Sequence, residues 1–227
     1  MGRNAIIRSV PTTCEVCGGR SDQMPAAGGV LTCPHCEHER PFVRPPLLVV
    51  VGPIGVGKST LCSRLAGTLP RVILLDADIF GAQNVSVAGD DPDYRAFWRW
   101  MIEVAHEIAQ NNVVVTYFSV MLPEQVLANV DALEYFDCVH FLYLKAPGHV
   151  LRERITRQAG TVASRAAIEA SLDERTKDWS GFNAILDEAM RNTPRTTVID
   201  GTRPLIAVES EVRAWIAEHL GALSHAT

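Results

Sequence analysis

The run GPIGVGKST has the residue types and the spacing that phosphate chemistry requires. It matches the pattern GxxxxGK[ST], follows the apolar segment LLVVV and opens a segment of helical character. Its glycines let backbone N–H groups turn inward, and a helix N-terminus adds partial positive charge. We therefore expect a loop that binds the phosphates of a nucleotide, made of Gly52, Pro53, Ile54, Gly55, Val56, Gly57, Lys58, Ser59 and Thr60.

Two side chains of this loop are expected to act on the phosphates directly. Lys58 should reach the β- and γ-phosphates of ATP, and Ser59 should place its hydroxyl on a Mg²⁺ ion. The alternative is a glycine-rich turn that joins a strand to a helix and binds nothing. The apolar segment before the loop and the helical segment after it favour a phosphate loop.

Two carboxylates follow the next apolar segment, VILLD. Asp76 and Asp78 stand where that strand should end, and the ligand crevice of an open parallel sheet lies at the carboxyl ends of its strands. If strand geometry persists to Asp78, both side chains lie on one side of the backbone. We expect Asp76 to serve the Mg²⁺ shell and Asp78 to accept or orient the proton of an acceptor hydroxyl. The alternative is a pair of turn or helix-capping aspartates.

A third candidate group is basic. The segment LYLKAPGHVLRERITRQ predicts a strand followed by a helix that carries Arg154 and Arg157 three residues apart, on one face. Arginines in this place could reach over the nucleotide and stabilise charge on a phosphoryl group in transfer. The alternative is a solvated basic face.

Four cysteines form two CxxC pairs separated by fifteen residues: Cys14, Cys17, Cys33 and Cys36. This spacing is typical of a zinc ribbon in which four thiolates close the coordination sphere, so the expected zinc is structural. The alternatives are His35 or His38 in place of a cysteine, an iron–sulfur centre, or free thiols.

These residues must be positioned by an α/β fold. Apolar segments at residues 47–51, 72–76, 113–118, 139–144 and 196–200 predict strands, and the segments between them predict helices, including 58–69, 91–110 and 205–220. Asp91 is the expected N-cap of the second of these helices. Apolar strands that alternate with helices predict a parallel sheet covered on both faces. The expected division is a zinc ribbon at 1–40, a proline-rich connector at 41–46 and one domain at 47–227.

Composition narrows the class of protein further. The net charge of −5 argues against a protein that coats nucleic acid or anionic membrane, and no apolar run has the length of a membrane span. The first residues lack the apolar core of a signal peptide, so we expect a cytoplasmic protein. Residues 1–40 balance four basic against four acidic residues, which favours protein docking over nucleic-acid binding by the ribbon.

From residue 47 onward the chain resembles the small P-loop kinases of the nucleoside/nucleotide kinase-like group, relatives of gluconate, shikimate and adenylylsulfate kinases. The order of landmarks carries the resemblance: the phosphate loop, Asp76-x-Asp78, and the helix with Arg154 and Arg157. The resemblance implies a P-loop NTPase three-layer sandwich with a five-stranded parallel sheet in the order 2-3-1-4-5 and a lid around 158–182. It also implies that the segment IDGT at 199–202 lies near the adenine. The third strand, where Thr116 and Tyr117 stand, has no acidic residue at its end.

We therefore expect an ATP- and Mg²⁺-dependent kinase whose acceptor is a small hydroxylated or phosphorylated molecule, most simply a nucleoside or nucleotide. The segment DPDYRAFWRW could supply an aromatic wall for that acceptor through Tyr94 and Trp98, or could pack against the sheet. The alternative function is a nucleotide-dependent binding or regulatory ATPase whose zinc ribbon docks nucleic acid or protein.

Overall fold

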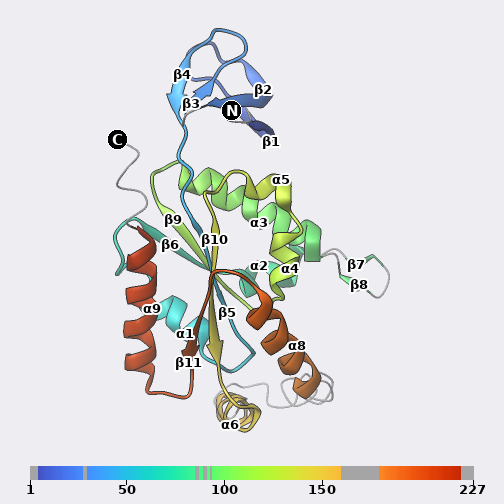
Figure 1. Ribbon diagram of the computed structural model, residues 1–227, viewed down its shortest axis with the longest axis vertical. Helices are drawn as coiled ribbons and strands as arrows, with labels where there is room; N and C mark the ends of the chain where they lie inside the picture. Colours follow the sequence, from blue (N-terminus) through green and yellow to red (C-terminus); the bar gives the residue numbers. More distant parts are fainter. Residues whose placement is uncertain are drawn as a thin grey trace.

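The computed structural model describes residues 5–27, 30–84, 87–88, 91–92, 94–159 and 179–220. Its centre is a parallel sheet of five strands in the order β11-β10-β5-β9-β6 (Figure 1). The strands are β5 (Leu47–Val51), β6 (Val72–Asp76), β9 (Val114–Ser119), β10 (Val139–Lys145) and β11 (Thr196–Asp200). Numbered along the chain and read from β6, this is the order 2-3-1-4-5. The predicted topology is confirmed.

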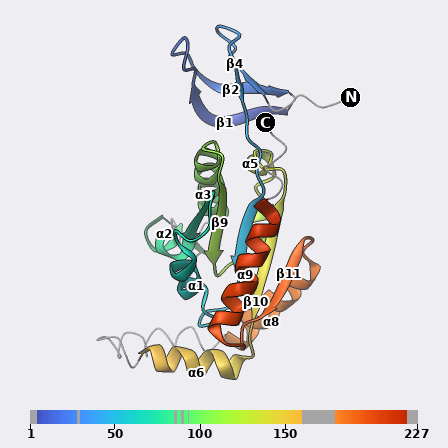
Figure 2. The same ribbon diagram turned by 90° about the vertical axis from the view of Figure 1, so that its left-hand side faces the viewer.

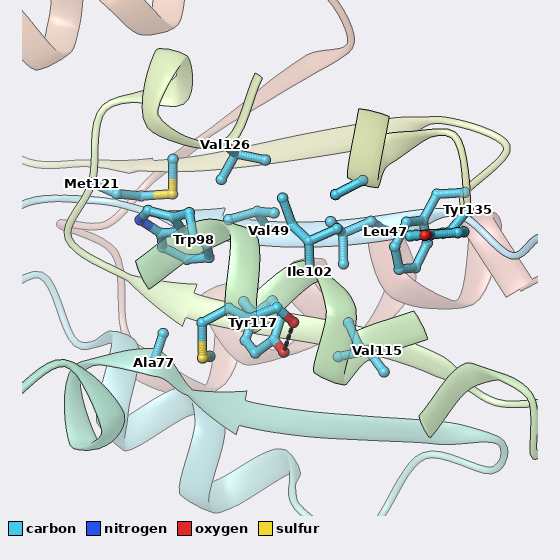
Figure 3. Close-up of a cluster of buried hydrophobic side chains, with 14 of the residues drawn as sticks. Leu47, Val49, Ala77, Trp98, Ile102, Val115, Tyr117, Met121, Val126 and Tyr135 are labelled. Carbon is cyan, nitrogen blue, oxygen red and sulfur yellow. Dashed lines mark hydrogen bonds between the residues drawn. The ribbon is translucent and has the colours of Figure 1, made fainter. Parts of the chain in front are cut away.

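Helices cover both faces of this sheet, because side chains alternate along strands that are buried on both sides. On β5, Leu48 and Val50 pack in one cluster with α1 and α9, whereas Leu47 and Val49 pack in another with α3 and α8 (Figures 1 and 3). The helices are α1 (Lys58–Leu65), α2 (Ala77–Asn84), α3 (Tyr94–Ala109), α4 (Pro123–Leu127), α5 (Val130–Leu133), α6 (Gly148–Ala159), α8 (Trp179–Asn192) and α9 (Leu205–Leu220).

Several predicted boundaries are wrong. The first helix ends at Leu65 rather than residue 69, and the chain then turns through Gly67, whose φ of 71° is left-handed. Asp91 caps no helix, because Asp91–Pro92 (β8) pairs with Val87–Ala88 (β7) and α3 begins at Tyr94. The third strand of the sheet spans Val114–Ser119 rather than residues 113–118.

The N-terminal segment forms a separate antiparallel sheet in the order β1-β2-β3-β4. Its strands are β1 (Ala5–Thr13), β2 (Arg20–Ala27), β3 (Val30–Thr32) and β4 (Glu39–Pro41). This sheet lies beyond the amino ends of the central strands, whereas α6 lies at their carboxyl ends (Figures 1 and 2). Any ligand at the phosphate loop is therefore at the opposite end of the molecule from the four cysteines.

The connector to the central sheet is packed against the larger body. Phe42 is 5% exposed and contacts the ring of His106 at 5.4 Å between centroids. The side-chain amide of Gln110 binds the backbone of Val43 twice: Val43 N donates to Oε1 at 3.3 Å, and Nε2 donates to Val43 O at 3.0 Å. These contacts with α3 and the residue after it fix the direction in which the chain enters β5.

The predicted lid at 158–182 lies mostly outside the described residues, which resume with α8 at Trp179. No helix among the described segments combines the length and the apolar character that crossing a membrane requires.

Candidate functional site

The phosphate loop connects β5 to α1 at the carboxyl edge of the sheet, and two of its glycines are required by geometry. Gly57 precedes α1 with φ 109°, a left-handed conformation that residues with a Cβ avoid. A Cβ at Gly52 would lie 2.8 Å from the backbone oxygen of Leu144 on the neighbouring strand β10. These two glycines therefore allow the tight turn that joins β5 to α1 beside β10.

Lys58 lies at the floor of this loop. Its side chain is buried, and Nζ donates to Gly52 O at 2.8 Å and to Pro53 O at 3.1 Å. Burial lowers the pKa of Lys58 to about 8, against the opposing attraction of Asp78 and Asp76. The two backbone oxygens and the two carboxylates therefore only partly offset the cost of burying this ammonium group.

A cavity of about 650 Å³, called the loop cavity below, opens over the loop. Such a volume is typical of small-molecule sites. It is lined by Ile54, Gly55, Val56, Gly57, Lys58, Ser59, Thr60, Leu61, Asp78, Val120, Arg154, Arg157, Gly201, Arg203, Leu205 and Val208. The structure thus brings together the loop, one of the two candidate aspartates and both candidate arginines. Gly52, Pro53 and Asp76 are not in the lining.

The two aspartates differ in placement. Strand geometry does not persist to Asp78, because β6 ends at Asp76 and α2 begins at Ala77. The condition for both carboxylates to share one side of a strand is therefore not met. Asp76 Oδ1 accepts a hydrogen bond from Asp78 N at 3.2 Å, in the manner of a side chain that caps a turn. Asp78 Oδ1 instead accepts from Ser119 Oγ at 3.1 Å and Val120 N at 3.3 Å.

The two arginines of α6 lie on the cavity but make different contacts. Arg154 is half-buried, and its Nη1 donates to Val56 O of the loop at 3.2 Å. Arg157 is exposed and pairs with Glu153 one turn earlier, with 2.6 Å between Arg157 Nη2 and Glu153 Oε1. Exposed pairs of this kind contribute little to stability, so Arg157 can exchange Glu153 for a phosphate at small cost.

The sequence analysis missed Arg203 as a residue of the cavity. Arg203 follows the segment IDGT directly and pairs with Glu211 of α9. Gly201 N donates to Lys145 O at 2.7 Å, and a Cβ at Gly201 would lie 2.8 Å from the side chain of Val56. The turn after β11 is therefore pressed against the loop, which brings Arg203 into the lining. The only sequence signal for Arg203 was its place next to IDGT.

The four cysteines have the geometry of a metal site. One ligand atom from each of Cys14, Cys17, Cys33 and Cys36 lies within 4.8 Å of every other. The Cys14–Cys36 and Cys17–Cys33 sulfur pairs are each 3.7 Å apart. A tetrahedron with Zn–S bonds of about 2.3 Å has edges of roughly 3.8 Å, so these thiols could bind zinc.

The two CxxC turns repeat one backbone arrangement. Gly18 N donates to Cys14 O and Glu37 N to Cys33 O, and in the same way Cys14 N donates to Gly19 O and Cys33 N to His38 O. His38 contacts Glu15 at 3.0 Å across the two turns instead of joining the sulfur cluster. Among the described residues the cluster is made of cysteines alone, without His35 or His38.

A comparison with family models matches residues 47–179, more than half of the chain, to an AAA domain. The chain belongs to this AAA domain family. The matched residues include the phosphate loop, both aspartates and both arginines of α6, and exclude the four cysteines and Arg203. Comparison with curated proteins gives no match.

Two solved structures share the fold of this chain over most of their length. A sugar kinase from Janibacter sp. HTCC2649 is 20% identical, with a TM-score of 0.54, over 77% of this chain and 95% of its own. A tunicamycin resistance protein from Deinococcus radiodurans is 16% identical, with a TM-score of 0.50, over 77% and 96%. These likenesses confirm, at the level of the fold, the resemblance to small P-loop kinases.

Within the AAA domain, the first half of α3 contains the two aromatic residues considered above as a wall for an acceptor. Trp98 is 1% exposed and packs edge-on to Tyr117 at 5.8 Å (Figure 3), so it belongs to the core rather than to an acceptor wall. Tyr94 is exposed. Arg95 donates to the backbone oxygen of Ala128, and Arg99 pairs with Glu103 and Asp131.

Proposed function

We propose that this AAA domain is an ATP- and Mg²⁺-dependent kinase that transfers a phosphoryl group to a small hydroxylated or phosphorylated acceptor, most simply a nucleoside or nucleotide. One observation carries the proposal: the loop cavity is lined together by residues 54–60 of the phosphate loop, Asp78, Arg154 and Arg157. Phosphoryl transfer requires positioning and charge stabilisation rather than covalent chemistry by the protein, and these groups can supply both.

Each group has a proposed role. Lys58 neutralises the β- and γ-phosphates, and Arg154 and Arg157 stabilise charge on the phosphoryl group in transfer. Asp78 receives or orients the proton of the acceptor hydroxyl, and Asp76 serves the metal shell. The turn at Gly201 and the apolar side chains of Leu205 and Val208 form the wall proposed for the adenine, in accord with the expected place of IDGT.

Oxygen donors near the loop fit a hard cation. Ser59 presents a hydroxyl on the same cavity as the carboxylate of Asp78, and Mg²⁺ binds through few protein oxygens together with those of phosphates. When bound, Mg²⁺ would neutralise charge on the phosphates.

We also propose that Cys14, Cys17, Cys33 and Cys36 hold one structural zinc ion. The all-thiolate ligand set and the two 3.7 Å sulfur distances support zinc, and a closed set of four ligands leaves no position for bound water. The ribbon would then be a docking module at the amino edge of the sheet, with no direct part in transfer. A cytoplasmic location is part of the same proposal.

A panel of nucleosides, nucleotides and sugars, screened for ADP release from ATP, tests the proposal. An acceptor that raises ADP release above the rate with water alone supports the kinase. Lys58→Ala should abolish this stimulation while the far-ultraviolet circular dichroism spectrum is unchanged. If nucleotide binds tightly and no acceptor raises the rate, the regulatory ATPase is the better account.

A further inference from the structure

Ser119 lies at the carboxyl edge of the central sheet, between the ends of β5 and β6. It is the last residue of β9, pairs in register with Val51 at the end of β5, and is only 4% exposed. Val51 leads directly into the phosphate loop. The neighbouring strand on the other side, β6, leads into Asp78 through the start of α2. Ser119 is therefore the buried hydroxyl between the two chain segments that carry the phosphate loop and the carboxylate.

The hydroxyl of Ser119 makes a specific bond in this position. Ser119 Oγ donates to Asp78 Oδ1 at 3.1 Å, and the next backbone N–H, that of Val120, donates to the same oxygen at 3.3 Å. Hydrogen bonds to a charged acceptor are about twice as strong as those between neutral groups. Both donors use Oδ1, so neither engages Oδ2.

This arrangement brings a carboxylate from the start of α2, just after the edge strand β6, towards the loop. β6 is two strands away from β5 in the sheet, yet Asp78 lines the loop cavity with Lys58 and Ser59, and its attraction on Lys58 exceeds that of Asp76. The connection between Asp78 and the end of β9, which lies next to β5, accounts for this reach.

We infer that Ser119 is a positioning residue that fixes the carboxylate of Asp78 in the loop cavity through Oδ1 and leaves Oδ2 for the acceptor hydroxyl. The inference rests on the proposed kinase function and adds to it a residue at the end of the third strand. Ser119 need not touch the nucleotide or the acceptor. Its effect on the reaction passes through Asp78.

Three variants and a double variant test this role by steady-state kinetics. Ser119→Ala removes one of the two donors and should lower kcat roughly tenfold to a hundredfold, with the KM for ATP unchanged, because one hydrogen bond to a charged group is lost. Ser119→Thr keeps the hydroxyl and should retain most of the activity. In the Asp78→Asn background, Ser119→Ala should cause little further loss, since residues that act as one unit are not additive.

Thr116→Val is the matched control. Thr116 is a fully buried residue of the same strand, and its hydroxyl has no hydrogen-bond partner among the residues that the structure describes. Removal of this hydroxyl should leave kcat unchanged. An equal loss of kcat in Thr116→Val and Ser119→Ala would show that any change in the buried strand disturbs the site, and would overturn the inference.

A second measurement does not depend on transfer. The ¹³C resonance of the Asp78 carboxyl, assigned by its absence in Asp78→Asn, should shift in Ser119→Ala and stay in place in Thr116→Val. If the wild-type protein transfers phosphate to no acceptor while this shift is seen, the proposed function fails and the contact between Ser119 and Asp78 stands. If the resonance does not move in Ser119→Ala, the inference is wrong whatever the activity.

Discussion

Nucleotide affinity should depend on pH through Lys58. Burial lowers the pKa of Lys58 to about 8 from its usual 10.5, and the phosphates of a nucleotide favour the ammonium form. Above pH 8, binding must therefore take up a proton. Between about pH 7 and pH 9 the protonated fraction falls from about nine tenths to about one tenth, so the dissociation constant should rise roughly tenfold, or about 1.4 kcal/mol.

Nucleotide affinity should fall as the pH rises, whereas the stability of the protein without nucleotide should increase. The folded chain releases the proton of Lys58 near pH 8, whereas the unfolded chain keeps it up to about pH 10.5. The unfolded state binds more protons in this window, so the free energy of unfolding should increase across it, by up to about 3 kcal/mol from this group. Below pH 8 both states carry the charge and the contribution is constant.

Isothermal titration with a non-hydrolysable ATP analogue, at fixed Mg²⁺ and ionic strength, measures the affinity across this range. Lys58→Arg is the control because its charge does not titrate there, so its affinity should be flat whatever its absolute value. A flat profile for the wild-type protein, or an equal decline in Lys58→Arg, would refute the assignment of the effect to Lys58.

Three further predictions concern the carboxylates, the cysteines and the connector. Asp78→Asn should lower kcat roughly 10²–10⁴-fold with little change in ATP affinity, whereas Asp76→Asn should raise the Mg²⁺ concentration needed for activity. Steady-state rates, together with nucleotide titrations with and without Mg²⁺, distinguish the two effects. The reverse pattern would show that the two aspartates have exchanged roles. Cys33→Ser should lose one zinc per chain by elemental analysis. Cys62→Ser, a change at a buried cysteine of α1 outside the sulfur cluster, should keep it. Iron or no metal in the wild-type protein would contradict the zinc site. Phe42→Ala removes a buried aromatic ring and should lower the free energy of unfolding by about 3–5 kcal/mol in denaturant titrations. The affinity for nucleotide should be unchanged. A weakened affinity would show that the packing of the connector affects the phosphate loop.

The parts of the site that were predictable from sequence are the local ones. The phosphate loop is one continuous segment whose glycines, lysine and flanking strand and helix are all visible in order, and the CxxC pairs are equally local. The order of the five strands followed from the resemblance of their landmarks to the small P-loop kinases. Their burial followed from apolar runs such as Leu47–Val51, which are covered on both faces.

The parts that were not predictable depend on contacts between distant segments. Whether Asp78 faces the cavity depends on where β6 ends and on donors from the end of β9, about forty residues later in the chain. Arg203 enters the cavity because the turn at Gly201 packs on Val56. The N-terminal strands were not predicted, because residues 1–40 contain no long apolar run. Their pairing is set instead by the two CxxC turns, which connect β1 to β2 and β3 to β4.

The central claim is that one cavity holds both the nucleotide phosphates and the carboxylate that serves an acceptor hydroxyl. Its most direct test is the transfer of label from [γ-³²P]ATP to the acceptor that best stimulates ADP release, measured for the wild-type protein, Lys58→Ala and Asp78→Asn. The account predicts labelled acceptor with the wild-type protein, none with Lys58→Ala, and a loss of transfer with retained nucleotide binding in Asp78→Asn. Label released only as inorganic phosphate, at a rate that Asp78→Asn does not change, would contradict it.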